Sequence, residues 1–584
     1  MSKALFSGNE AVARGLFETG VSVVSSYPGT PSTEITESAA GYAEMYSEWA
    51  PNEKVAVEVA LGASIGGARA FAGMKHVGLN VAADPLFTAS YTGVNAGLVI
   101  AVADDQGLHS SQNEQDSRHW ARSAKLPMLE PADSAECLAF TKFAYELSEE
   151  YDTPVLLRLS TRVSHSRSLV TAGERADIPL KPYEKNPRKY VMMPAMAKER
   201  HEFVEARTLR LAELAERTPL NTTEENVNAK IGVITAGIAY QYAKEALGNN
   251  ASYLKLGMIA PLPEKVIRDF AARFRRVVVI EELDGVIETH CKALGIPVIG
   301  KELFGYTGEY SAGLIKEKLL GEKPVTREYP EQTPPRPPVL CPGCPHRGVF
   351  YVLNKLKLTV MGDIGCYTLG ALAPLSALDV CVCMGASVSS LHGINTARGA
   401  DFAKSAIAVL GDSTFIHSGI TGIIDIAYNK GVSTVMVLDN SITGMTGHQQ
   451  NPTTGLTIKG DPTSSVNLEL LARACGFNRV RVIDPFDLSG AESVLKEELQ
   501  VREPSFIIAR RPCALLKTVK SNPPVFCDEN ACTGCKMCMK AGCPAISMKK
   551  TAGKSKAQID KTLCTGCGVC EKICRFKALM AIDS

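Results

Sequence analysis

Two runs of cysteines near the end of the chain have the spacing of metal ligands. Eight of the 18 cysteines lie in a 43-residue window, mostly at every third position. They are Cys532, Cys535, Cys538, Cys543, Cys564, Cys567, Cys570 and Cys574. Thiolates spaced in this way hold iron–sulfur clusters or zinc, and packing alone rarely produces such a pattern.

The two runs closely resemble those of a bacterial two-cluster ferredoxin. In that family three thiolates of each run cap one face of a [4Fe-4S] cube, and the fourth reaches the other cluster. The resemblance implies two sets of ligands, which we name quartet A (Cys532, Cys535, Cys538 and Cys574) and quartet B (Cys564, Cys567, Cys570 and Cys543). Two zinc sites are the main alternative, but Pro544 after the first run favours clusters. An extra residue before Cys543, and Arg575 where Pro is usual, remove no ligand.

A second set of polar residues interrupts the apolar stretch Ala406 to Pro452. Gly411-Asp412-Ser413 follows one run typical of a buried strand, and Asp439-Asn440 follows the next. In open α/β sheets ligands bind at the carboxyl ends of strands, where helix N-termini can hold phosphate. Magnesium prefers oxygen ligands, and Asp412 and Asn440 can supply them. A turn with a helix cap is the alternative for Gly411-Asp412.

The spacing of these residues resembles the thiamine diphosphate motif, which opens with Gly-Asp-Gly and closes with Asn. The resemblance implies that Asp412, Asn440 and the backbone carbonyl of Ile442 hold magnesium. It also implies that Ser413 and Thr414 approach the diphosphate. Ser413 stands where the motif has glycine.

Glu58 is the candidate for the acid–base chemistry that thiamine diphosphate requires. We predict a strand from Lys54 to Glu58, followed by a small-residue helix from Ala60 to Ala68. A carboxylate in such apolar surroundings is either bonded to something specific or reaches solvent at the strand end. Thiamine chemistry needs a carboxyl group on the aminopyrimidine ring, so we predict that a buried Glu58 has this role.

The length and composition indicate several domains in a soluble protein. A single core stops growing at about 250 to 300 residues, and this chain has 584. A net charge of +1 gives no reason to expect a nucleic acid or an anionic membrane as partner. The sequence has neither a membrane-spanning run nor the apolar core of a signal peptide, so we expect a cytoplasmic protein with reduced cysteines.

We expect an α/β protein with doubly wound domains. The alternation of strand-like and helix-like runs, together with the motifs, gives the following division. Residues 1–170 form a pyrimidine-binding thiamine diphosphate domain, 171–228 a polar helical connector, 229–325 a domain like the C-terminal domain of transketolase, 326–338 a proline-rich linker, 339–515 a diphosphate- and magnesium-binding domain, and 525–584 a small α+β ferredoxin domain with two [4Fe-4S] clusters.

The whole chain resembles the 2-oxoacid:ferredoxin oxidoreductases, and most closely the alpha subunits that act on indolepyruvate. The resemblance rests on Cys341-Pro-Gly-Cys344 and on the segments at 27–34, 58–64, 110–118, 411–415 and 439–443. In relatives the Cys-Pro-Gly-Cys pair and two later cysteines hold a third [4Fe-4S] cluster. The resemblance implies the same for Cys341, Cys344, Cys366 and Cys513, which we name quartet C.

The resemblance implies an activity and its partners. Aryl 2-oxoacids, indolepyruvate and phenylpyruvate, would be oxidatively decarboxylated with coenzyme A to arylacetyl-CoA and carbon dioxide, and electrons would pass through the clusters to an external ferredoxin. Thr30 would contact the substrate or the pyrimidine ring beside Glu58. A smaller beta subunit is expected in an α2β2 assembly.

Three other functions remain open at this stage. One is the same chemistry on another 2-oxoacid. Another is a non-oxidative thiamine-dependent decarboxylase or lyase, against which the intact cysteines count. The third is an electron-transfer subunit with an inactive cofactor fold, against which Glu58, Asp412 and Asn440 count.

Overall fold

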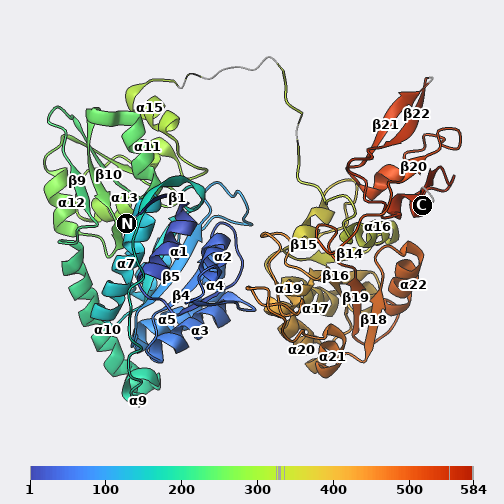
Figure 1. Cartoon of the computed structure of the whole chain (residues 1–584), viewed down its shortest axis with the longest axis horizontal. Helices are drawn as coiled ribbons and strands as arrows, with labels where there is room; N and C mark the ends of the chain where they lie inside the picture. The colour runs from blue at the N-terminus through green and yellow to red at the C-terminus, as the bar shows by residue number, and fades with distance from the viewer. Residues whose placement is uncertain (1, 324, 326–330, 335, 552, 582–584) are drawn as a thin grey trace. The chain divides into compact units, whose positions relative to one another are not determined.

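The chain folds into two units, Met1–Pro330 and Glu331–Ser584, and each contains a largely parallel sheet (Figure 1). The computed structural model describes residues 2–323, 325, 331–334, 336–551 and 553–581. The expected proline-rich linker at 326–338 lies partly outside these residues, which leave out 326–330 and 335. None of the helices described is long and apolar enough to cross a membrane.

A seven-stranded sheet forms the centre of the first unit. Its order is β12-β6-β7-β5-β4-β2-β3, and all neighbours pair in parallel except β12 with β6. The strands are β2 (Val23–Ser26), β3 (Tyr46–Trp49), β4 (Ala70–Lys75), β5 (Leu98–Asp104), β6 (Met128–Leu129), β7 (Val155–Ser160) and β12 (Met258–Ala260). Every residue of β4, β5 and β7 is buried, which is typical of parallel strands covered on both faces.

Helices cover both faces of this sheet (Figure 1). Alternate residues of β5 belong to two separate apolar cores, with Val99 in one and Ile100 in the other. The core of Val99 includes residues of α1 (Gly8–Glu18), α2 (Thr33–Ala40) and α7 (Ser134–Tyr151). The core of Ile100 includes residues of α3 (Glu53–Ile65), α4 (His76–Val81) and α5 (Ala83–Thr92). The doubly wound architecture expected for this part of the chain is therefore confirmed.

Residues 54–58, predicted as a strand, instead lie in helix α3. Asn52 caps this helix, since its side chain accepts a hydrogen bond of 2.9 Å from the backbone N–H of Val55. Lys54 and Glu58 form an ion pair one helical turn apart. The cap and the small residues that follow outweigh the strand preference of Val55 and Val57. The prediction was wrong because a short apolar run does not distinguish a buried strand from a buried helix.

The region after the connector helix α10 (Pro194–Ala215) adds a four-stranded sheet of order β13-β10-β11-β9. Its strands are β9 (Thr222–Glu224), β10 (Ile231–Ala236), β11 (Ala251–Leu256) and β13 (Arg276–Ile280), accompanied by helices α11 (Gly237–Leu247), α12 (Glu264–Ala271), α13 (Val286–Ala293) and α15 (Ala312–Leu320). Val278 of β13 also forms a single parallel bridge with Ile299. Strand β12 lies within 229–325 in the sequence, but it pairs antiparallel with β6 at the edge of the first sheet.

A six-stranded parallel sheet of order β15-β14-β16-β17-β19-β18 forms the centre of the second unit. Its strands are β14 (Thr359–Gly362), β15 (Val380–Cys381), β16 (Ala406–Gly411), β17 (Thr434–Asp439), β18 (Arg479–Ile483) and β19 (Ser505–Arg510). Helices α16 (His346–Leu356) and α22 (Leu488–Glu498) contribute to one core, and α17 (Ala386–Arg398) and α20 (Ile420–Tyr428) to the other. This sheet is doubly wound as well.

The end of the chain forms the expected small α+β domain. Strand β20 (Phe526–Cys527) pairs with β23 (Leu579–Met580), and β21 (Ile546–Thr551) with β22 (Lys554–Ile559). Ala541 and residues of helix α23 (Val569–Ile573) belong to the same core as α16. The cysteine-rich end is thus packed onto the second unit's sheet domain.

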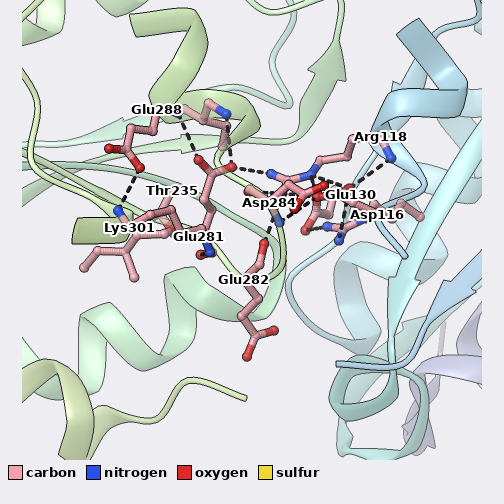
Figure 2. Close-up of polar contacts among 12 residues, drawn as sticks. Asp116, Arg118, Glu130, Thr235, Glu281, Glu282, Asp284, Glu288 and Lys301 are labelled. Atoms are coloured by element: carbon pink, nitrogen blue, oxygen red, sulfur yellow. Dashed lines mark hydrogen bonds and ion pairs between the residues drawn. The ribbon is translucent and has the colours of Figure 1, made fainter. Parts of the chain in front are cut away.

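A buried network of charges ties the 229–325 region to the first sheet domain (Figure 2). Arg118 lies at its centre, and both oxygens of Asp116 accept hydrogen bonds from its guanidinium group. Arg118 also forms an ion pair with Glu281 and donates to the carbonyls of Glu282 (3.0 Å) and Asp284 (2.9 Å). All three side chains of the Arg118, Asp116 and Glu281 group are almost fully buried, so each charge depends on its partners.

Replacing Arg118 with Met should destabilise the first unit by about 3–5 kcal/mol, because it leaves Asp116 and Glu281 buried without a cation. Both tryptophans of the chain, Trp49 and Trp120, lie in this unit, so their fluorescence during urea unfolding reports on it selectively.

Arg162→Gln is the matched control, because Arg162 pairs with Glu309 of the same region but is 53% exposed. This change should cost less than about 1 kcal/mol. Equal losses in the two variants would contradict the importance of the buried network.

Candidate cofactor and iron–sulfur sites

Three polar residues lie at one edge of the second unit's sheet. Asp363 follows β14, Asp412 follows β16 and Asn440 follows β17, which are neighbouring strands. All three residues are buried, with Asp412 2% exposed. The structure therefore brings together Asp412 and Asn440, as the sequence predicted, at the edge where such sheets bind ligands.

Asp412 is a buried carboxylate without an ion-pair partner among the residues that the structure describes. Its oxygens accept from the backbone N–H of Ser413 (2.7 Å) and the hydroxyl of Thr453 (3.3 Å). Burial, together with the nearby charge of Asp439, raises the pKa of Asp412 to about 7. Asp439 itself is paired with Arg510 at 2.8 Å. A cation at Asp412 would relieve this unfavourable charge, so the donor set fits magnesium.

The other predicted residues of this site lie beside Asp412 in the chain and are buried. The hydroxyl of Thr414 accepts from the hydroxyl of Tyr367 (2.9 Å) and donates to the carbonyl of Ile364 (3.2 Å). Ser413 and Thr414 belong to the first turn after β16, where backbone N–H groups suit a phosphate. Ile442 is 3% exposed and follows Asn440 closely, so its carbonyl is a candidate ligand for the same ion.

Asp363 is a buried carboxylate that sequence reasoning missed. It accepts the backbone N–H of Gly385 (2.9 Å) and of Ser387 (3.1 Å), at the start of helix α17. These bonds position α17 against the sheet edge. The signal was present, since Gly362-Asp363 follows a strand as Gly411-Asp412 does.

Quartet C gathers close to Asn440. The backbone N–H of Cys513 donates to the carbonyl of Asn440 at 2.9 Å. Burial raises the pKa of Cys366 to about 11, with contributions from the negative charges of Cys341 and Cys513. Burial likewise raises the pKa of Cys344 to about 12, and the charges of Cys366 and Cys341 add to this effect. The four thiols are therefore near enough to interact electrostatically, as shared ligands of a cluster must be.

Quartets A and B line two separate cavities. The cavity of quartet A is lined only by residues between Cys532 and Leu579. The cavity of quartet B is also lined by Pro342, Gly343 and Arg347, which belong to the segment of quartet C. Each cavity thus contains the four cysteines that the ferredoxin resemblance implies for one cluster.

Backbone N–H groups point at three of these sulfurs. Ala557 donates to Cys532 Sγ (3.4 Å), Val525 to Cys564 Sγ (3.4 Å) and Ala578 to Cys574 Sγ (3.3 Å). Such bonds favour the thiolate and tune the potential of a cluster.

A group of acidic and histidine side chains in the first unit also brings potential metal ligands together. Within the described ranges, only Asp116, His119 and Asp284 bring three potential ligand atoms within 4.8 Å of one another. Asp116 already forms an ion pair with Arg118. The group of Asp116, His119 and Asp284 therefore does not suit a metal ion.

Glu58 and Thr30 belong to the first unit. Glu58 is exposed on α3 and paired with Lys54. The prediction that its side chain is buried was therefore wrong. The apolar side of α3, with Ala56, Val57 and Ala60, faces the core and leaves Glu58 outside. Thr30 is half-buried.

Lys75 lies beside Thr30 and was missed from the sequence. The hydroxyl of Ser110 donates to the carbonyl of Thr30 (3.3 Å), and the ammonium group of Lys75 donates to the carbonyl of Ser110 (2.6 Å). Burial lowers the pKa of Lys75 to about 8. The feature that could have revealed Lys75 in the sequence is its place at the carboxyl end of an apolar run, the fully buried strand β4. Thr30 thus adjoins a buried cationic side chain.

Comparison with known proteins identifies three family matches. Residues 14–232 match the family described as "Pyruvate flavodoxin/ferredoxin oxidoreductase, thiamine diP-bdg". Residues 363–509 match "Thiamine pyrophosphate enzyme, C-terminal TPP binding domain", and residues 557–580 match "4Fe-4S binding domain". These matches support thiamine diphosphate and iron–sulfur clusters as cofactors.

Relatives named "Indolepyruvate oxidoreductase subunit IorA" match nearly the whole chain. The protein of Archaeoglobus fulgidus is 38% identical, over 93% of this chain and 92% of its own. The protein of Pyrococcus horikoshii is 39% identical, over 99% and 96% respectively. The protein of Methanothermobacter marburgensis is 40% identical, over 92% and 91%. With the thiamine-type sheet edge and the cysteine quartets, these matches establish that the chain belongs to the indolepyruvate oxidoreductase IorA family, the alpha subunits of thiamine-dependent 2-oxoacid:ferredoxin oxidoreductases.

Proposed function

We propose that this chain catalyses the oxidative decarboxylation of aryl 2-oxoacids, indolepyruvate and phenylpyruvate, with coenzyme A. The products would be arylacetyl-CoA and carbon dioxide, with electrons passed to an external ferredoxin. The observation that carries the proposal is the junction of two sites at Asn440, which follows β17 beside Asp412 and accepts a hydrogen bond from Cys513. Electrons released at a cofactor there would have a cluster beside it. The names of the relatives support the aryl substrates.

Asp412, Asn440 and the carbonyl of Ile442 would hold magnesium and, through it, the diphosphate. Thiamine diphosphate, when bound, supplies the electron sink for decarboxylation. Ser413 and Thr414 would position the phosphates, while Asp363 keeps the start of α17 in place. In the first unit, Glu58 would serve as the carboxylate for the aminopyrimidine ring, since its side chain is accessible. Thr30 would approach the substrate beside Lys75, whose charge suits a carboxylate.

The three quartets form a sequence from the sheet edge outward. Quartet C adjoins Asn440, and its Pro342-Gly343 turn lines the cavity of quartet B. Quartet A is enclosed only by the terminal domain. We therefore infer that electrons pass from quartet C to B and then to A.

The surface around quartet A suits an acidic electron acceptor. Residues 525–584 contain ten Lys and Arg against five Asp and Glu. Cys535 and Lys536 are exposed, and Phe576, which lines the cavity of quartet A, is 50% exposed. An exposed aromatic side chain and an exposed lysine, in a domain with an excess of positive charge, are complementary to a negatively charged ferredoxin.

Two further elements of the proposal come from the family. A smaller beta subunit is expected in an α2β2 assembly, as the word "subunit" in the names of the relatives suggests. A non-oxidative thiamine-dependent lyase is the alternative function. Three quartets leading away from the sheet edge have no use in such an enzyme, so we favour the oxidative reaction.

The proposed function is tested by anaerobic purification of the chain with any co-purifying small subunit. Iron and thiamine diphosphate are counted, and ferredoxin reduction is followed with indolepyruvate, phenylpyruvate, pyruvate and 2-oxoglutarate plus coenzyme A. We expect about twelve irons per chain, four for each cluster, and reduction selective for the aryl substrates. About eight irons would remove quartet C from the scheme, and no reduction with any 2-oxoacid would reject the enzyme.

Replacing Asp412 with Asn should lower the content of bound thiamine diphosphate at least tenfold, because the amide lacks the charge that neutralises magnesium. Thiamine released from the purified protein is measured by fluorescence after oxidation to thiochrome. Asp401→Asn, at an exposed aspartate paired with Lys404 in the same domain, should retain the wild-type content. Full cofactor content in the Asp412 variant would refute the assignment.

Reversing the charge of Lys536 with Glu should raise the KM for ferredoxin several-fold at low salt, because it opposes the steering of an acidic partner. Reduction of a small viologen dye should stay at the wild-type rate, since no protein surface is needed. Lys496→Glu, on α22, is the control for a charge reversal away from the terminal domain. An unchanged KM in the Lys536 variant would move the docking site elsewhere.

A further inference from the structure

Arg347 is a buried arginine, 1% exposed, in the first turn of α16. One of its terminal nitrogens donates to the carbonyls of Leu340 (2.6 Å) and Cys341 (2.9 Å). The other donates to the carbonyl of Ala541 at 2.7 Å. A single guanidinium group thus joins the segment of quartet C to the segment that carries Cys543 of quartet B.

Arg347 also lines the cavity of quartet B, and its Nε is buried with no hydrogen-bond partner in the described part of the chain. Nor does its guanidinium form an ion pair with any carboxylate described. Arg118 and Arg158, which are similarly buried, each pair with two or more carboxylates. Arg207, by contrast, is buried without an ion pair among the residues described, and bonds to the carbonyl of Asp152 and the hydroxyl of Ser90. A buried cation without an ion pair is costly, and the guanidinium group of Arg347 lies at a cavity lined by four cysteines, where a cluster would supply the missing negative charge.

Arg347 lies beside both quartets. Its guanidinium group bonds to the carbonyl of Cys341 in quartet C and lines the cavity that contains Cys543 of quartet B. The other charges near quartet B are Glu571 and Lys572, which are neighbours of opposite sign, and Arg511, which is paired with Asp484. Lys572 is exposed and donates to the carbonyl of Phe486 (2.8 Å). Arg347 is therefore the buried cation among these charges, and it lines the cavity itself.

We infer that Arg347 is a positioning residue for electron transfer, whose positive charge raises the reduction potential of the cluster held by quartet B. A cluster gains negative charge when it takes up an electron, so a fixed cation beside it favours the reduced form. Electrons leaving quartet C are thereby drawn toward quartet B. This inference depends on the cluster assignments of the proposed function.

The test is a redox titration of the anaerobic holoenzyme followed by electron paramagnetic resonance. In Arg347→Met we expect one cluster to become harder to reduce, by about tenfold in its reduction equilibrium, or about 59 mV for one electron. The other clusters should shift less. After rapid mixing with substrate, electrons should accumulate on the cluster nearest the cofactor.

Two further variants separate charge from structure. Arg347→Lys keeps the charge and should retain iron and the wild-type potential. Arg511→Met removes an exposed arginine that also interacts with Cys567 of quartet B but is paired with Asp484, so it should shift the potential little.

Three outcomes would overturn the inference. They are an unchanged potential in Arg347→Met with full iron, an equal shift in Arg511→Met, and a lowered potential in Arg347→Lys. If Arg347→Met does not assemble its clusters, the potential measured in Arg347→Lys tests the inference instead. Wild-type enzyme with fewer than about eight irons would instead reject the cluster assignments on which the inference depends.

Discussion

Parallel strands bring their carboxyl ends to one edge of a sheet, and the chemistry of the second unit depends on this constraint. Asp363, Asp412 and Asn440 are far apart in sequence, yet they follow neighbouring strands and so meet at that edge. The same edge receives Cys513, whose segment follows β19 and bonds to Asn440. A site for a diphosphate and a site for a cluster are therefore consequences of one sheet topology.

Buried charges in this protein fall into two groups that differ in their partners. Arg118 is neutralised by carboxylates of the chain, and its network holds two parts of the first unit together. Asp412 and Arg347 are equally buried but form no ion pair among the residues described. Asp363 and Arg207 are also buried without an ion pair in the described part of the chain, and bond to backbone groups and to the hydroxyl of Ser90. Asp412 and Arg347 lie instead at the sheet edge and at a cysteine-lined cavity, where a cation and an anion from outside the chain would offset their charge. The same physical cost thus separates residues that stabilise the fold from residues that serve a cofactor.

The extent to which the sequence predicted the structure differs from site to site. Cysteine spacing is a local property, and the quartets inferred from it line the two cavities of the terminal domain. Asp412 and Asn440 were predictable because strand ends in parallel sheets converge. Glu58 was placed wrongly on a strand, because a Val-Ala-Val run suits both secondary structures and only the Asn52 cap decides. Lys75 and Arg347 were missed because their surroundings come from distant segments, which no local pattern reveals.

Strand β12 has a consequence for how the chain acquires its structure during synthesis. The edge of the first sheet is completed by Met258–Ala260, which pair with β6 more than a hundred residues earlier. Until the ribosome has released these residues, β6 exposes unpaired backbone groups on which another nascent chain could add a strand. The first sheet is therefore completed only after residues 258–260 have been synthesised, later than all its other strands. The 229–325 region protects that edge, besides any part it has in catalysis.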